Sequence, residues 1–144
     1  MVNNRIVSRF DGDHPPPEGA SRKIPDGPLY PADEVLALLA QECEPSIQLW
    51  TRKCTSDAQR LGLDLDDLRA LLEQALHSGR FKGSEWCRQG SNGPWAACDA
   101  YELLRKEWIE NAHKYMTVEY YLKFAVARTG RVLLLVSCHL SGNW

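Results

Sequence analysis

The sequence predicts an α+β fold in which N-terminal helices pack on one face of a small antiparallel sheet. Three observations support this. Segments in the first half carry apolar residues at helical spacing, the second half is mainly strand-like, and its last two segments form a clear hairpin. Helices followed by a run of antiparallel strands are typical of α+β proteins. A chain of 144 residues usually builds one core, so we expect one domain.

The first helix is expected to begin after Pro31, because proline favours the first helical turn. Val35, Leu36, Leu38 and Leu39 then recur at helical spacing, and Glu44-Pro45 should end the helix. Residues 47–52 alternate in polarity like a short strand.

Two further helices are expected before residue 80. Thr55 or Ser56 could cap a brief helix that runs to Leu61, where Gly62 stops it. A stronger helix opens at Asp64 and ends at Ser78-Gly79. Its apolar residues form a single stripe made of Leu65, Leu68, Leu71, Leu72, Ala75 and Leu76.

The middle of the chain is expected to contribute strands over residues 80–87 and 95–101, joined by a loop over 90–94 that is rich in glycine. The stretch 102–115 is ambiguous. Its apolar residues fit a helix almost as well as an irregular strand, and we favour the strand.

The C-terminal hairpin, with arms over 118–127 and 132–140, can be placed in two registers. A two-residue turn would set Tyr120 opposite His139 and mix polar groups into the apolar side. A three-residue loop over 129–131 gives one uniformly apolar face, and we predict this register. It pairs Leu122 with Cys138, Phe124 with Val136, Val126 with Leu134, Tyr121 with His139, and Lys123 with Ser137.

Residues 1–28 are expected to form a flexible N-terminal arm, with the single domain spanning 29–144. The arm contains the run His14-Pro15-Pro16-Pro17 and other breakers, and it has almost no apolar periodicity. The longest uncharged apolar run, 132–136, is far shorter than the roughly 20 residues of a membrane span. We therefore expect a cytoplasmic protein without membrane contact.

The five cysteines are scattered without CxxC or paired Cys/His spacing, so we expect reduced thiols and no metal site. The formal net charge of −2 counts against a nucleic-acid enzyme, because neutralising phosphates favours a basic surface. A local basic patch can still exist on an acidic protein. The positions of the lysines and arginines therefore decide the matter.

Five short motifs occur in the order and spacing seen in one family of bacterial toxins. They are the LGLDLD segment at 61–66, Phe81-Lys82, Trp95 with Asp99-Ala100-Tyr101, Tyr121-Leu122-Lys123 and Val136-Ser137. In these motifs, over residues 30–139, the chain resembles the MqsR toxins. The resemblance implies a RelE-like fold and a sequence-selective endoribonuclease that cuts messenger RNA without a metal or cofactor. It also implies a protein antitoxin, either MqsA-like or of the helix-turn-helix type.

The resemblance places the family's active-site lysine on Lys82 and its tyrosine on Tyr121. The lysine of the last strand falls on His139, and the family's glutamine falls on Cys98. Both are departures from the family pattern. Histidine, however, is a better proton shuttle than lysine near neutral pH, with an unperturbed pKa of about 6.5.

Metal-free cleavage needs an activated 2′-hydroxyl, a stabilised phosphorane and a protonated leaving group. We assign proton transfer to His139 and binding of the scissile phosphate to Lys82. Tyr121 orients that phosphate or takes part in the proton transfer. Glu85 could serve as a base near His139, although a solvated carboxylate is the favoured interpretation. The RNA-binding candidates are Lys123, Arg128, Arg131 and, as a base-stacking ring, Trp86 or Trp95, although core packing is favoured for both tryptophans.

Two alternatives to an active toxin stay open. The polar face of the hairpin could be an ordinary solvated surface. The chain could also be a catalytically inactive protein- or RNA-binding regulatory module on the same fold. The basic residues of the arm, Arg5, Arg9, Arg22 and Lys23, could touch RNA, although a solvated tail is favoured.

Overall fold

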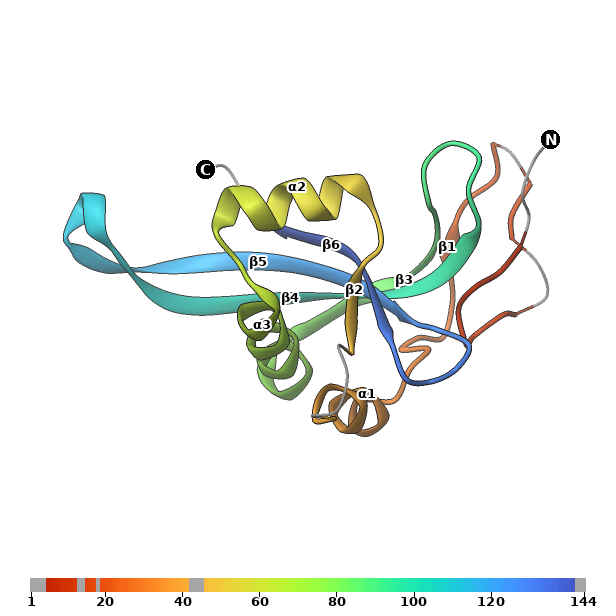
Figure 1. Cartoon of the computed structure of the whole chain (residues 1–144), viewed down its shortest axis with the longest axis horizontal. Helices are drawn as coiled ribbons and strands as arrows, with labels where there is room; N and C mark the ends of the chain where they lie inside the picture. The colour runs from red at the N-terminus through yellow and green to blue at the C-terminus, as the bar shows by residue number, and fades with distance from the viewer. Residues whose placement is uncertain (1–4, 13–14, 18, 42–45, 142–144) are drawn as a thin grey trace.

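The computed structural model describes residues 5–12, 15–17, 19–41 and 46–141 (Figure 1). It has an α+β fold built on a six-stranded sheet with the strand order β1-β3-β4-β5-β6-β2. The strands are β1 (Lys23–Ile24), β2 (Ile47–Leu49), β3 (Arg80–Arg88), β4 (Trp95–Ile109), β5 (Lys114–Val126) and β6 (Leu133–Leu140). The helices are α1 (Ala32–Leu39), α2 (Arg52–Leu61) and α3 (Leu65–Ser78), and a single 3-10 turn covers Glu110–Ala112.

Two features of the sheet differ from the expectation. The sheet is mixed, because β2 pairs in parallel with β6, with Ile47 opposite Leu133. The helices also do not all precede the strands, since α2 and α3 lie between β2 and β3 in the chain. These two helices carry the chain from β2, at one edge of the sheet, to β3, which lies next to the opposite edge strand β1. The last strand then arrives beside β2 running in the same direction.

Helix α2 begins earlier than expected. The side chain of Thr51 accepts a hydrogen bond of 3.1 Å from the Cys54 amide, so Thr51 is the N-cap in place of Thr55 or Ser56. The strand expected over 47–52 is correspondingly shorter. Gly62 ends the helix in the left-handed conformation (φ 70°), as predicted. Helix α1 already ends at Leu39, and the predicted stop at Glu44-Pro45 falls outside the described residues.

Helix α3 has the predicted bounds. Asp64 and Asp67 form a capping box, in which each carboxylate accepts a hydrogen bond from the other residue's amide. Four members of the predicted stripe are buried. Leu65 is 42 % exposed, and it is the first residue of the helix. The buried members are Leu68, Leu71, Leu72 and Ala75.

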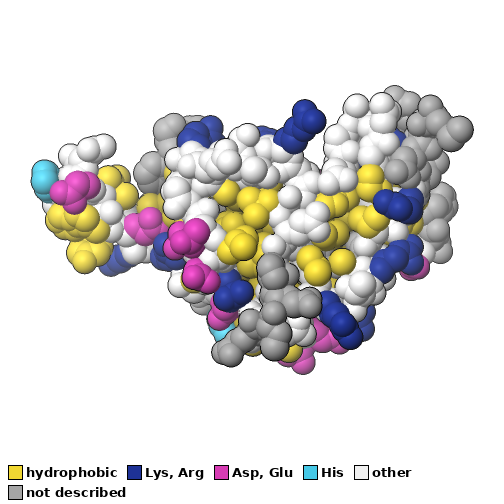
Figure 2. Space-filling model, in the orientation of Figure 1, with side chains coloured by type: hydrophobic (Ala, Val, Ile, Leu, Met, Phe, Trp, Pro, Cys, Tyr) yellow, Lys and Arg dark blue, Asp and Glu magenta, His cyan; other side chains and the backbone are white. Residues whose placement is uncertain are grey.

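The ambiguous stretch 102–115 is mostly strand, as we favoured. Strand β4 continues to Ile109, and His113 takes the left-handed conformation (φ 49°) in the turn to β5. Figure 1 shows the resulting two-stranded hairpin projecting from the body of the molecule. At its end Trp108 and Tyr115 pack edge to face at 5.3 Å between ring centroids and are 49 % and 70 % exposed. Figure 2 shows hydrophobic, acidic and histidine side chains together at this tip.

The register of the C-terminal hairpin is confirmed in the half that lies away from the β5–β6 turn, where Tyr121 lies opposite His139 and Lys123 opposite Ser137. Beyond Lys123 it shifts by one residue, so Phe124 faces Leu135 and not Val136, and Val126 faces Leu133 and not Leu134. Val136 is the extra residue of a β-bulge at this point. A bulge adds one residue to one strand, which displaces every pair beyond it.

The described residues 5–9 of the segment that we expected to be a flexible arm lie against the sheet. They fill the gap where β4 and β5 separate: Ile6 bridges to Trp95 and Ser8 bridges to Ala127. Ser8 is fully buried, and its hydroxyl accepts a hydrogen bond from the Ala97 amide and donates one to the Phe10 carbonyl. Backbone hydrogen bonding to the sheet thus replaces the apolar periodicity that this segment lacks.

The two faces of the sheet differ. Side chains alternate along a strand, and the set that includes Tyr101, Leu122 and Cys138 packs into the core beneath the helices. Cys138, for example, contacts Cys54 of α2, with 3.4 Å between the sulfur atoms. We call the opposite face the open face. Of the described helices, none is long and apolar enough to cross a membrane.

Candidate functional site

Four adjacent strands place one polar side chain each in a row across the open face. Glu102 of β4 lies opposite Tyr121 of β5, which lies opposite His139 of β6. On the other side, Lys82 of β3 lies with its Nζ 4.0 Å from a carboxylate oxygen of Glu102. We call Lys82, Glu102, Tyr121 and His139 the polar row. The three residues that we assigned to catalysis therefore lie on one surface, together with a carboxylate that the sequence had left in an ambiguous segment.

Lys82 reaches the polar row because β3 contains a bulge. Phe81 pairs with Tyr101 and Gly83 pairs with the next residue, Ala100, so Lys82 is the extra residue between them. Bulges often redirect a side chain next to a functional site. Gly83, with φ 130°, supplies a backbone conformation that other residues rarely adopt.

Tyr121 and His139 form one end of the row. Their rings stack at 5.0 Å between centroids with an interplanar angle of 23°. Burial raises the pKa of the Tyr121 hydroxyl, which therefore keeps its proton at neutral pH. The Nδ1 atom of His139 lies 3.1 Å from the Leu140 carbonyl oxygen. A carbonyl oxygen can only accept, so this contact is a hydrogen bond when Nδ1 carries the hydrogen, and in that tautomer Nε2 can accept a proton.

Acidic groups surround the Lys82 end of the row. Arg80 donates to Glu102 at 3.2 Å. Hydrogen bonding to Ser141 and to Glu102, with the charges of Arg80 and Lys82, lowers the pKa of Glu119, on the neighbouring strand. The charges of Lys82 and Arg80 are thus partly balanced by two carboxylates.

A second pair of charges crosses the open face next to the row. The Lys123 ammonium donates to the Glu85 carboxylate at 2.6 Å. These residues are on β5 and β3, and the side chains of β4 between them, Cys98 and Ala100, are small. Burial alone would lower the pKa of Lys123, but Cys87 and Glu85 raise it above its usual value. Lys123 therefore remains charged, and Glu85 is held by Lys123 and is not paired with His139.

Two cavities open on this face on either side of Glu85. The larger, of about 730 Å³, lies between the start of α2 and the end of β3, and the smaller, of about 450 Å³, lies between β1 and the polar row. Seven lysines and arginines line the two cavities, against one carboxylate, Glu85. The cations are Arg22, Arg52, Lys53, Arg88 and Lys123 in the larger cavity, and Lys23 and Lys82 in the smaller. A local basic surface therefore exists on this acidic protein.

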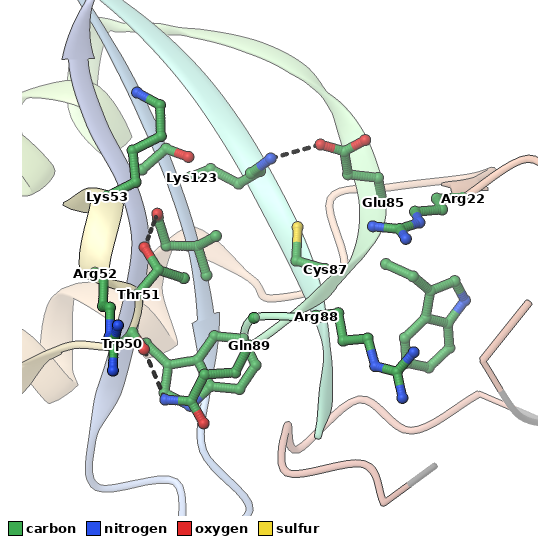
Figure 3. Close-up of a pocket in the computed structure, with 14 residues that line it drawn as sticks. Arg22, Trp50, Thr51, Arg52, Lys53, Glu85, Cys87, Arg88, Gln89 and Lys123 are labelled. Carbon is green, nitrogen blue, oxygen red and sulfur yellow. Dashed lines mark hydrogen bonds and ion pairs between the residues drawn. The ribbon is translucent and has the colours of Figure 1, made fainter. Parts of the chain in front are cut away.

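Figure 3 shows how the larger cavity is walled. The Gln89 side-chain amide donates to the Trp50 carbonyl at 2.7 Å, which ties the end of β3 to the start of α2. Thr51 donates to the carbonyl of the bulged Val136 at 2.9 Å. Lys123 lies across the floor, and the sulfur of Cys87 points into the space (Figure 3).

The other RNA-binding candidates are Arg128, Arg131 and Trp86, and the two arginines lie away from the two cavities. Arg128 donates from Nε to the Ile6 carbonyl at 2.7 Å, so it anchors the N-terminal segment. Arg131 lies in the β5–β6 turn, and neither arginine borders the two cavities. Trp86 lines the larger cavity, but it is only 8 % exposed and packs with Trp95 and Ala97, which leaves little ring surface for a base.

The sequence analysis missed most of the residues of the larger cavity. Arg22 was assigned to a solvated tail, and residues 50–52 were assigned to a strand, although the basic and aromatic composition of residues 50–53 was a usable signal. No group of three or more His, Cys, Asp or Glu residues that could hold a metal ion occurs among the residues with described positions.

Comparison of the chain with protein-family models, with curated proteins and with solved structures gave no match.

Proposed function

We propose that this protein is a metal-independent, sequence-selective endoribonuclease that cuts messenger RNA, and that it is the toxin of a bacterial toxin–antitoxin system. The observation that carries the proposal is the polar row on the open face, in which Lys82, Tyr121 and His139 lie together beside two cavities rich in cations. The motifs shared with the MqsR toxins support the same conclusion and suggest a RelE-like fold.

The chemistry of the row suits cleavage by the neighbouring 2′-hydroxyl. Nε2 of neutral His139 takes the proton from the 2′-oxygen, which attacks the phosphorus. The bond from phosphorus to the 5′-oxygen then breaks, and the hydroxyl of Tyr121 gives its proton to that oxygen. Water returns the proton from the His139 imidazolium to Tyr121, so the products are a 2′,3′-cyclic phosphate and a 5′-hydroxyl. Lys82 stabilises the charge on the phosphoryl oxygens.

A second candidate function is RNA binding without cleavage, as an inactive regulatory module. The observation that favours it is the pair of carboxylates, Glu102 and Glu119, next to Lys82. These negative charges would repel a phosphate close to the residue that is meant to hold it. The two candidates share the same RNA-binding face and differ only in the reaction.

The toxin assignment brings two further proposals. The partner is a cognate protein antitoxin, MqsA-like or of the helix-turn-helix type, whose binding restrains the activity. The site of action is the cytoplasm, where messenger RNA is translated.

Cleavage of a long unstructured RNA by the purified protein, with chelator present, tests the proposal. The variant His139→Ala should cut about 10²–10⁴-fold more slowly, because one positioned acid or base typically contributes this factor. His77→Ala is the matched control, since His77 is exposed in the last turn of α3. It should cut at the rate of the unchanged protein.

The outcomes separate the candidates. Equal cleavage by His139→Ala and the unchanged protein would remove the catalytic assignment. RNA binding without any cleavage by the unchanged protein would favour the inactive module. In bacteria, expression of the unchanged protein should arrest growth and His139→Ala should not.

A further inference from the structure

The larger cavity adjoins the polar row but is lined by none of its residues. Lys123 and Ser137, which line the cavity, each lie two residues along their strands from Tyr121 and His139. Two residues of a strand span roughly 6.6 Å, a distance that one nucleotide can bridge. A strand of RNA with its cleaved bond at the row would therefore pass over this cavity.

The charge of the cavity is suited to a phosphate. Five cations and one carboxylate line it, a formal charge of +4, which falls to +3 when the Asp57 carboxylate paired with Lys53 at 3.0 Å is included. Arg52 and Lys53 stand on one wall at the positive end of α2, and Arg22 and Arg88 stand on the opposite wall (Figure 3). Thr51 already accepts from the Cys54 amide, so the cationic side chains supply more of the attraction than the amides of the helix.

The cavity also has the form of a site for one small polar ligand. Its volume of about 730 Å³ falls within the 300–1,000 Å³ range of typical ligand pockets. The Gln89–Trp50 hydrogen bond joins its two walls, so the cavity does not depend on a single loop. Trp50 and Cys87 add apolar surface to the lining, against which the base or sugar could rest.

We infer that this cavity binds one nucleotide, whose phosphate lies between the wall formed by Arg52 and Lys53 and the ammonium of Lys123 at its floor. The inference deepens the proposed function and rests on it in taking the open face as the RNA-binding face. The same chemistry fits a nucleotide within an RNA strand or a free nucleoside monophosphate. The experiment distinguishes these two sources.

The first measurement is the salt dependence of binding to a labelled 2′-O-methyl oligonucleotide, which cannot be cleaved through its 2′-oxygen. For a protein bound to a single-stranded nucleic acid, each phosphate contact contributes about 0.7 to the slope of log K against log salt. Because the proposed site holds one phosphate, the double variant Arg52→Ala/Lys53→Ala should lower the slope by about 0.7. The control Lys106→Ala/Lys114→Ala removes the same charge at exposed positions of the β4–β5 hairpin outside the cavity, and should leave the slope unchanged. Equal slopes for the two double variants would overturn the inference.

The second measurement uses Cys87 as a reporter. Hydrogen bonding with Cys98 and the charge of Lys123 lower the pKa of the Cys87 thiol, whereas Cys54, Cys98 and Cys138 are fully buried. Alkylation by iodoacetamide, followed on the Cys87 peptide by mass spectrometry, should slow when the cavity is filled. Lys123→Gln should raise the pKa of this thiol and slow its alkylation near neutral pH.

Protection of Cys87 by the oligonucleotide but not by a nucleoside monophosphate would assign the cavity to an RNA strand, and equal protection by both would assign it to a free nucleotide. Protection by neither would overturn the inference. Because the oligonucleotide is not cut, these results are independent of catalysis. Cleavage that depends on His139, together with an unprotected Cys87, would leave the proposed function standing and remove only the nucleotide cavity.

Discussion

Removal of the Asp99 carboxylate should destabilise the fold more than any other single change of a polar side chain described above. Asp99 is fully buried on β4. It accepts hydrogen bonds of 3.0 Å from the backbone amides of Leu29 and Tyr30, and one of 2.6 Å from the Ser84 hydroxyl. These bonds fix the segment between β1 and α1 against the sheet, and β1 supplies Lys23 to the smaller cavity.

The magnitude follows from the donors left behind. Asp99→Ala leaves two amides and one hydroxyl without their acceptor, at about 1–3 kcal/mol each. Relief of the cost of burying a carboxylate offsets part of this sum. We therefore expect a loss of roughly 3–6 kcal/mol in the free energy of unfolding, out of a total of about 5–15 kcal/mol for a typical domain. Asp99→Asn keeps one acceptor and the shape, and should lose less.

Urea unfolding followed by tryptophan fluorescence measures this loss, provided that the slope of free energy against urea stays constant. Asp66→Asn is the control, because the Asp66 side chain is 90 % exposed on α3 and its loss should cost less than about 1 kcal/mol. A midpoint for Asp99→Ala that matches the midpoint of this control would refute the view that Asp99 anchors residues 29 and 30.

Two further predictions concern buried polar groups. Ser8→Ala should lower the free energy of unfolding by about 1–3 kcal/mol in the same urea experiment, because the Ala97 amide loses its acceptor; a change near zero would mean that the N-terminal segment is not part of the folded unit. Burial and a hydrogen bond to Glu107 raise the pKa of Tyr120 to about 12. Since tyrosine in an unfolded chain ionises near pH 10, its contribution to stability is complete below pH 10 and is lost as the pH rises from 10 to 12. Tyr120→Phe should remove this fall in the free energy of unfolding between pH 10 and 12. An unchanged fall in the variant would show that Tyr120 does not cause it.

Local signals predicted the helices well. The capping carboxylate Asp64 and the left-handed Gly62 act through residues within one helical turn, so both can be read from the sequence. The cap at Thr51 was missed because Thr55 and Ser56 are equally good capping residues. Tertiary contact decides between them, since the Thr51 hydroxyl also donates to Val136 on the last strand.

Strand pairing and the candidate site were predictable only in part. The alternation of polar and apolar residues correctly predicted that Tyr121 lies opposite His139, because this pairing depends only on which residues share a face of the sheet. The bulges at Lys82 and Val136 have no comparable signal, and they decide where Lys82 points and where the larger cavity has its wall. The cavity itself joins residues near positions 22, 52, 88 and 123, so no local window of the sequence contains it.

The N-terminal segment between β4 and β5 has a consequence for the order of folding. Residues 6–9 leave the ribosome well before their partners, which are at positions 95 and 126–128. Contacts so distant in the chain form slowly, because a long loop must close before they contribute. Although residues 6–9 are synthesised before their partners, they would then be among the last to dock. Until they do, the gap between the two strands exposes unpaired backbone groups of the kind that chaperones and neighbouring chains can bind.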